Sequence, residues 1–208
     1  MKAKSQRKQV EDKLSETVLE MLKAFFPKGK EMTLKEIMKK SSYSYEPVYR
    51  TLQELEKKKI IGVKKFGKTL VYDLNFSKQE PKIAFYLYAV RRANDFSKKH
   101  PSIFAALSEL PEDKIDILAI FGSYAKGIQH EKSDVDVICV TSENDLTSKI
   151  RALKHAYNKN FSPVVLPKSE FAKIKVENKE FWHDLVEYGI IFKGYELFYY
   201  YTYLKEER

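Results

Sequence analysis

The spacing of apolar residues at the start of the chain predicts two helices. Between Leu14 and Phe26, apolar side chains recur every three or four residues, and the turn-forming stretch "PKGK" ends the run. In "TLKEIMKKSS", Thr33 stands three residues before Glu36, which is the reciprocal arrangement of a capping box. We therefore expect one helix over 14–26 and a short second helix that begins after Thr33.

The next stretch predicts a third helix followed by a hairpin. Pro47 falls in the first turn of that helix, where its missing N–H does no harm, and Val48, Leu52 and Leu55 form one buried stripe. The segment "IIGVKKFGKTLVYDL" then contains two strand-like runs that turn at its central "GK". Helix, helix, helix, hairpin is the element order of a winged helix.

A connector helix is predicted where the hairpin ends. The segment "PKIAFYLYAVRRANDF", residues 81–96, is apolar nearly all round, so we expect it to be covered on most sides. It is too short to span a bilayer, which needs about 18 apolar residues or more. We interpret residues 79–99 as a connector that packs between two domains or against a second subunit in a homodimer.

Two buried strands and a tight turn dominate the second half. "IDILAIF" from Ile115 to Phe121 is a continuous apolar run that ends in Gly122-Ser123. A second apolar strand runs from Asp134 to Val140, and its period of two places Asp134 and Asp136 on one face. The tail predicts a helix over 180–188, a short strand "IIFKG" and a last helix with the tyrosine run "FYYYTY", which we interpret as a packing face.

Charge is unevenly divided along the 208 residues. Residues 1–92 carry 22 Lys and Arg against 11 Asp and Glu, and the chain totals of 38 and 29 leave 16 against 18 for the rest. The first part is thus +11 and the second −2. This asymmetry is typical of a nucleic-acid-binding module joined to a near-neutral domain, and a solvated Lys-rich surface is the alternative.

Cysteine usage and hydropathy limit the class of protein. Cys139 is the single cysteine, so neither an internal disulfide nor a cysteine-based zinc site can form within the chain. The sequence shows no membrane span and its start lacks the apolar core of a secretion signal. We expect a cytoplasmic protein with no membrane partner.

The two aspartates and the Gly-Ser turn indicate a metal and phosphate chemistry. A strand followed by Gly122, Ser123 and a helical turn directs backbone N–H groups at one spot, where phosphates bind. Two neighbouring carboxylates repel each other unless a cation lies between them. Mg²⁺ commonly takes one or two carboxylates together with substrate phosphates, so Asp134 and Asp136 predict a nucleoside triphosphate site.

The stretch "GSYAKG…SDVDV" resembles the signature of the minimal nucleotidyltransferases of the DNA polymerase β superfamily, over roughly residues 100–194. The resemblance implies that Gly122 and Ser123 hold the triphosphate, and that Asp134 and Asp136 bind Mg²⁺ and are catalytic. Lys126 lies in the same turn, where it is either a phosphate contact or a solvated surface lysine.

The next strand departs from the pattern of that family. Active members usually carry a third carboxylate there, whereas this chain has "FSPVVLPKSEF" with Ser162 or Pro163 at the corresponding place. The nearest acids are Asp145 before the strand and Glu170 beyond it. We interpret Glu170 as a first-turn residue of the following helix, capped by Ser169 or a neighbour. Catalysis is thus less secure than nucleotide binding.

Residues 10–75 resemble winged helix-turn-helix DNA-binding domains of bacterial and archaeal regulators. In those domains the third helix enters the major groove and the hairpin wing touches the DNA backbone or minor groove, so the resemblance implies a double-stranded DNA partner. The corresponding candidate residues are Tyr43, Tyr49, Arg50, Lys64, Lys65 and Lys68. Arg50 is suited to a guanine edge and the lysines to phosphates, while a role as a protein-interaction module stays open.

The sequence as a whole predicts an α+β protein. It divides into a winged helix-turn-helix domain over 1–78, a connector helix over 79–99, and a minimal nucleotidyltransferase domain with a small mixed sheet flanked by helices over 100–208. The expected function is transfer of a nucleoside monophosphate from a nucleoside triphosphate to a hydroxyl. A nucleotide-sensing transcriptional regulator and an antitoxin-like protein that acts on a partner protein are the alternatives.

Overall fold

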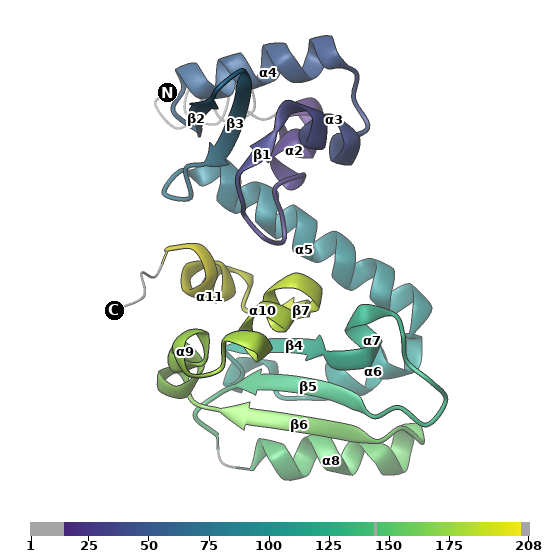
Figure 1. Ribbon diagram of the computed structural model, residues 1–208. Coiled ribbons are helices and arrows are strands. Elements are labelled where there is room, and N and C mark those ends of the chain that lie inside the picture. Colours follow the sequence, from purple (N-terminus) through teal and green to yellow (C-terminus); the bar gives the residue numbers. More distant parts are fainter. Residues whose placement is uncertain (1–14, 144, 205–208) are drawn as a thin grey trace, which may run out of the picture. The chain divides into compact units, whose positions relative to one another are not determined.

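The computed structural model describes residues 15–143 and 145–204, and the chain divides into two compact units, Met1–Tyr88 and Ala89–Arg208. The fold is α+β, and each unit contains its own sheet and its own buried core (Figure 1). The boundary between the units falls inside helix α5, Gln79–Lys99. Leu14, the expected start of the first helix, lies outside the described residues.

The first two described helices begin at polar caps. Helix α2, Glu16–Lys23, follows Ser15, whose hydroxyl accepts a hydrogen bond from the Val18 N–H at 3.3 Å; it is shorter than the run to Phe26 had predicted. Helix α3, Leu34–Ser41, begins at the predicted capping box, because the Thr33 N–H donates to Glu36 at 2.8 Å and the Glu36 N–H donates to Thr33 at 3.3 Å.

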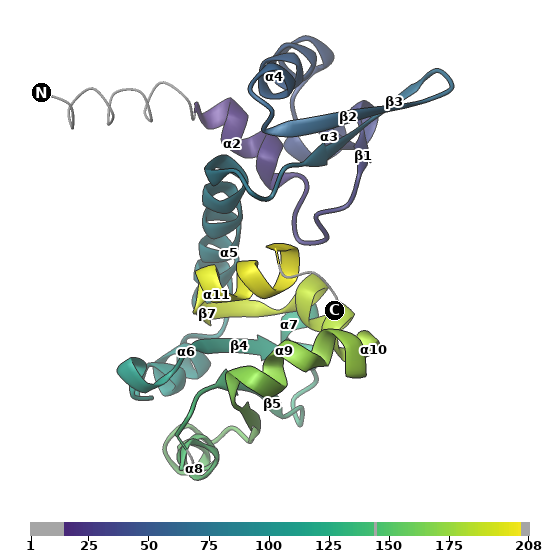
Figure 2. The same ribbon diagram turned by 90° about the vertical axis from the view of Figure 1, so that its left-hand side faces the viewer.

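Helix α4, Tyr45–Lys57, carries the predicted stripe of Val48, Leu52 and Leu55, each at most 2% exposed. Tyr43 lies before the helix, so its expected place in the third helix was wrong. The N-terminal sheet is antiparallel in the order β1-β3-β2, with strands β1 Met32–Thr33, β2 Ile61–Phe66 and β3 Thr69–Leu74. The turn between β2 and β3 falls at Gly67, as predicted (Figure 2).

Helix α5 is partly covered within the single chain. Ala84 and Phe85 are buried, but Tyr86 is 50% and Leu87 38% exposed. Packing of this helix against a second subunit stays a prediction. None of the helices within the described ranges is both long and apolar enough to cross a membrane.

The second unit contains a four-stranded mixed sheet in the order β6-β5-β4-β7. Strands β4 and β5 pair antiparallel, β4 and β7 pair antiparallel, and β5 and β6 pair parallel. The strands are β4 Ile117–Phe121, β5 Val135–Val140, β6 Phe161–Leu166 and β7 Ile190–Lys193. The helical elements are α6 Pro101–Ser108, η1 Glu112–Lys114, α7 Gly122–Lys126, α8 Leu146–Tyr157, α9 Lys168–Glu177, α10 Lys179–Tyr188, α11 Tyr195–Tyr199 and η2 Tyr200–Leu204.

Helices cover both faces of this sheet (Figure 2). Helices α6 and α8 pack on the face that carries Val135, Val137 and Cys139, where the residues form one buried cluster. The alternate residues of β5, which include Asp136 and Ile138, point to the opposite face, where α9, α10 and α11 lie. Asp136 is therefore on the α10 side of the sheet. The tyrosine run of the tail packs there, since Tyr199 is 1% exposed.

Candidate functional site

The predicted Gly-Ser turn connects β4 directly to α7. Gly122 opens the helix with a φ of +67°, a left-handed conformation that favours glycine. A Cβ atom placed on Gly122 would lie 2.9 Å from Cγ of Asp136, so the carboxylate of Asp136 sits directly against this glycine. The strand pairing agrees, because Phe121 and Asp136 are opposite each other in the β4–β5 ladder. The turn and the aspartate form one site.

The two predicted aspartates have different surroundings. Strand β5 begins at Val135, so Asp134 precedes the strand instead of opening it; Asp134 is exposed and Asp136 half-buried. Burial raises the pKa of the Asp136 carboxyl, and the neighbouring Asp134 carboxylate raises it further. The electrostatics therefore show two close carboxylates whose mutual repulsion a bound cation would relieve.

No third carboxylate joins this pair from the neighbouring strand. Ser162 is the register partner of Asp136 in the parallel β5–β6 ladder, so a serine hydroxyl occupies the position beside the carboxylate. Within residues 15–143 and 145–204, no group of three or more His, Cys, Asp or Glu side chains is placed to hold a metal. Asp134 and Asp136 can supply two oxygen ligands, and a hard cation there would need others from phosphate or water.

Glu170 and Asp145 lie on other elements. Glu170 is in the first turn of α9, as predicted; of the expected cap positions, Ser169 or a neighbour, the structure uses Pro167, and no side chain hydrogen-bonds to the start of the helix. Proline fixes an extended entry that leads into the helix without a polar cap. Asp145 pairs with Lys149 on α8 at 2.6 Å.

Lys126 is engaged by an acid from α10. Its ammonium forms an ion pair with Asp184, and it lies 5.3 Å from the centre of the Tyr188 ring. The hydrogen bond to Asp184 raises the pKa of Lys126. The two side chains are 31% and 40% exposed, so solvent and ligands can reach them. Lys126 is therefore already paired in this structure, and its contact with phosphate stays a prediction.

Asp184 is the residue near the site that sequence reasoning missed. It lies on α10, where the ring of Phe181 packs edge-on against Phe121 with ring centres 5.1 Å apart, and no local sequence pattern connects Asp184 with Lys126. The neighbouring His183 is 58% exposed and lies 3.5 Å from Glu187.

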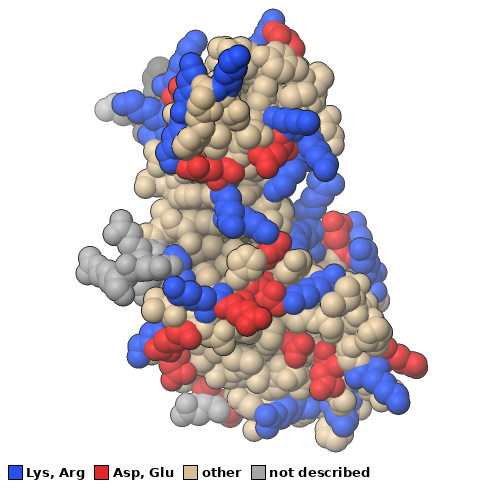
Figure 3. Space-filling view, in the orientation of Figure 1, with Lys and Arg blue, Asp and Glu red and all other residues tan. Residues whose placement is uncertain are grey.

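The candidate DNA-contacting residues lie on α4 and on the β2–β3 hairpin. Arg50 is exposed and pairs with Glu46 at 2.6 Å, and Tyr49 stacks on Tyr45 with ring centres 5.5 Å apart. Lys64 pairs with Glu31, whereas Lys65 and Lys68 are exposed. Lys and Arg side chains gather over this unit in Figure 3. Tyr43 stands just before α4 and is half-buried.

Residues 106–194 match the family model of the polymerase beta nucleotidyltransferases. This range contains β4, the Gly122–Ser123 turn, both aspartates and β6. Residues 106–194 are a polymerase β nucleotidyltransferase domain. The match does not extend to the N-terminal unit, and no curated protein matches the chain by sequence.

Two solved structures show weak similarity to this chain. A toxin–antitoxin structure with AMP-PNP is 21% identical, covers 50% of this chain and 82% of its own, and has a TM-score of 0.35. A protein from Sulfolobus solfataricus, assigned as a nucleotidyltransferase, is 19% identical, covers 50% of this chain and 85% of its own, and has a TM-score of 0.25. The assignment of the nucleotidyltransferase domain depends on the family match alone.

Proposed function

We propose that the nucleotidyltransferase domain binds a nucleoside triphosphate together with Mg²⁺ at the Gly122–Ser123 turn, and transfers a nucleoside monophosphate to a hydroxyl. The observation that carries this proposal is the contact of the Asp136 carboxylate with Gly122. It brings a metal ligand and a phosphate-binding turn to the same point. Family membership of residues 106–194 supports the same chemistry.

Each residue of the site has a distinct part. The backbone N–H groups that begin α7 and the Ser123 hydroxyl hold phosphate oxygens. Asp134 and Asp136 would hold Mg²⁺, which neutralises the triphosphate and stabilises the departing pyrophosphate. Lys126 would exchange its ion pair with Asp184 for a phosphate oxygen. The oxygen-only donor set of two carboxylates fits a hard divalent cation.

The serine beside Asp136 limits the rate of transfer. An attacking hydroxyl must lose its proton, and Ser162 cannot accept one at neutral pH as a carboxylate can. General-base help is worth about 10²-fold to 10⁴-fold, so we expect slow transfer on generic acceptors and persistent nucleotide binding. A domain of this kind also suits the alternative of a nucleotide sensor in a regulator.

Thermal unfolding with ligands tests nucleotide binding. MgCl₂ and the non-hydrolysable triphosphate AMP-PNP together should raise the Tm more than the sum of their separate effects, because each completes the site of the other. Asp134→Asn and Asp136→Asn should abolish this synergy, and Asp113→Asn, an exposed aspartate on η1, should keep it. Equal responses of all three variants and the parent would show that Asp134 and Asp136 are not ligands.

We also propose that the N-terminal unit binds double-stranded DNA as a winged helix-turn-helix domain. Its helices α2, α3 and α4 precede the β2–β3 hairpin, which is the element order of that class. The net charge of +11 over residues 1–92 and the exposed Arg50, Lys65 and Lys68 supply the electrostatics.

Salt titration of DNA binding by the full chain tests this second proposal. Affinity for duplex DNA should fall steeply as salt rises, since neutralised phosphates release counterions. Arg50→Ala should weaken binding and relax sequence choice, whereas Lys173→Ala, an exposed lysine of α9 outside this unit, should change neither. Absence of binding at about 50 mM salt, where phosphate contacts are strong, would favour a protein-interaction module.

A further inference from the structure

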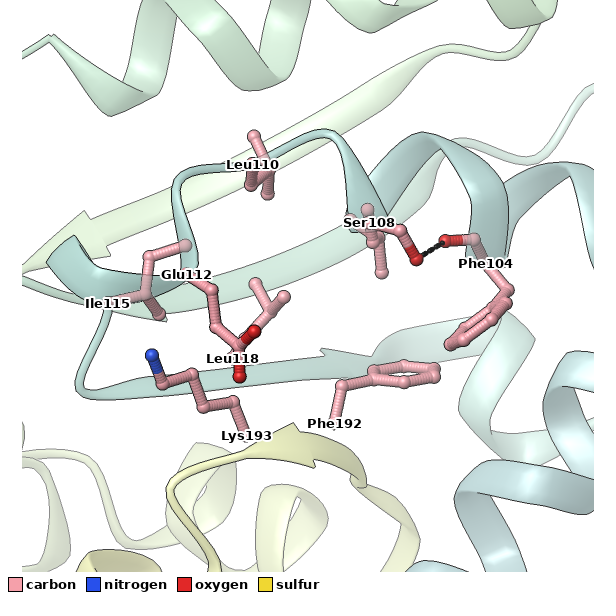
Figure 4. Close-up of a pocket in the computed structure, with 9 residues that line it drawn as sticks. Phe104, Ser108, Leu110, Glu112, Ile115, Leu118, Phe192 and Lys193 are labelled. Carbon is pink, nitrogen blue, oxygen red and sulfur yellow. Dashed lines mark hydrogen bonds between the residues drawn. The ribbon is translucent and has the colours of Figure 1, made fainter.

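An apolar cavity of about 260 Å³ lies between α6, η1 and strands β4 and β7, on the sheet face opposite to Asp136 (Figure 4). Leu107, Leu110, Ile115 and Leu118 form its buried part, each at most 7% exposed. The rings of Phe104 and Phe192 lie 6.0 Å apart at one side, and Phe104 is 44% exposed. The cavity is thus open to solvent along an aromatic wall.

A β-bulge in β7 builds this wall. In the β4–β7 ladder, Leu118 pairs with Lys193 while the adjacent Ala119 pairs with Ile191, so Phe192 is an extra residue. The bulge allows the consecutive side chains of Phe192 and Lys193 to line the same cavity, which a regular strand would send to opposite faces. Bulges commonly re-aim a side chain in this way near functional sites.

The cavity also holds two opposite charges that do not pair with each other. Glu112 from η1 and Lys193 from β7 both line it, and Figure 4 shows both side chains at the same end. Across the described ranges, neither residue forms an ion pair. Lys193 is half-buried and Glu112 is exposed, so a ligand in the cavity can reach both charges.

We propose that this cavity binds a free α-amino acid with an apolar side chain. The ammonium group of the ligand would donate to Glu112, its carboxylate would accept from Lys193, and its side chain would fill the space beside Phe104, Leu118 and Phe192. A zwitterion supplies both missing partners at once, and a purely apolar ligand would leave both charges unpaired. The volume lies just below the range of about 300–1,000 Å³ that is usual for ligand pockets, which suits a single amino acid better than a peptide.

Calorimetric titration of the full chain with L-phenylalanine and L-leucine tests the proposal. Two probes that each lack one charge are the matched ligands: 3-phenylpropionate has no ammonium and phenethylamine has no carboxylate. Glu112→Gln and Lys193→Gln are the variants, and Asp113→Asn and the exposed Lys173→Gln on α9 are their controls. Ligand-free unfolding of each variant shows whether the fold is kept.

At least one of the two amino acids should bind, and each charge-removing variant should weaken its binding by about 10-fold or more, the usual loss for a charged hydrogen bond. The two controls should bind as the parent does. If 3-phenylpropionate or phenethylamine binds as tightly as L-phenylalanine does, the proposal that the cavity recognises both charges of the ligand is wrong. If neither amino acid gives a heat of binding at concentrations up to 10 mM, any binding is weaker than about −2.7 kcal/mol in free energy. The cavity is then not an amino-acid site. A parent dimer that Phe104→Ser converts to a monomer would assign the cavity to a subunit interface instead.

Discussion

At the scale of single residues, the Asp136 carboxyl group has opposite effects on the proposed binding of Mg²⁺ and on the stability of the ligand-free protein. Its raised pKa means that the folded protein holds the proton more tightly than the unfolded chain does. The stabilisation that the bound proton gives to the folded state is fully present below the ordinary carboxyl pKa of 3.8. It is lost as the pH rises through the raised pKa of Asp136. Asp136→Asn should therefore raise the Tm of the ligand-free protein at pH 7 and change it less at pH 4, as calorimetry at the two pH values can show. A Tm that falls equally at both pH values would mean that the carboxylate is structurally required.

The ion pair between Asp184 and Lys126 leads to a second prediction about single residues. Asp184→Asn should release Lys126 and tighten binding of Mg²⁺ with AMP-PNP by several-fold, because the phosphate no longer competes with a carboxylate. The same change in a Lys126→Gln background should have little effect, and titration calorimetry of the four proteins forms a double-mutant cycle. If Asp184→Asn has the same effect in both backgrounds, Lys126 does not contact the bound phosphate.

These residues also show what the sequence can predict about the site. The Gly-Ser turn and the two aspartates are local motifs on their own strands, so their spacing was enough to propose them together. Asp184 comes from a helix about 60 residues later and reaches Lys126 only through the packing of α10 on α7. Such a partner depends on tertiary structure, which periodicity does not describe.

Strand β6 is the element on which the proposed catalysis depends. Since Ser162 is the register partner of Asp136, Ser162→Asp places a carboxylate beside the proposed metal ligands. Incorporation of label from an α-labelled triphosphate should then rise, within the range of about 10²-fold to 10⁴-fold that a general base supplies. Val164→Asp, two residues along the same strand face, is the control and should give no gain. Brisk transfer by the parent, lost in Glu170→Gln, would instead identify Glu170 as the third ligand.

The hairpin β2–β3 supplies a graded prediction for DNA binding. Lys64 is held by Glu31, so a DNA phosphate must displace an existing partner, whereas Lys65 is exposed. Lys65→Ala should therefore weaken duplex binding and lower the salt dependence more than Lys64→Ala does, in fluorescence anisotropy over a salt series. A larger loss from Lys64→Ala would contradict this order. Glu31→Ala should then strengthen binding by removing one of the two acids beside Lys64, the other being Asp73 at 3.9 Å.

The elements that carry local motifs were predicted, whereas helices α6 and α8, the element boundaries and the irregularities were not. The capping box of Thr33 and Glu36 and the stripe of α4 are sequence-local and were found in place. Strand β4 begins at Ile117, two residues later than predicted; η1 ends at Lys114, and residues 115 and 116 lie between the two elements. The bulge at Phe192 could not be predicted, since it arises from pairing between β7 and β4.

At the scale of the whole molecule, the two proposed activities occur in one chain, and linkage can reveal whether they are coupled. If the chain is a nucleotide-sensing regulator, Mg²⁺ with AMP-PNP should change its duplex DNA affinity by about 5-fold to 150-fold, and DNA should change nucleotide affinity by the same factor. The measurement is anisotropy of labelled duplex DNA at fixed salt, with and without saturating ligand. Asp136→Asn should bind DNA as the parent does without nucleotide and lose the response. If DNA affinity is the same with and without nucleotide, while labelled transfer proceeds, the nucleotidyltransferase domain acts as an enzyme independently of DNA binding.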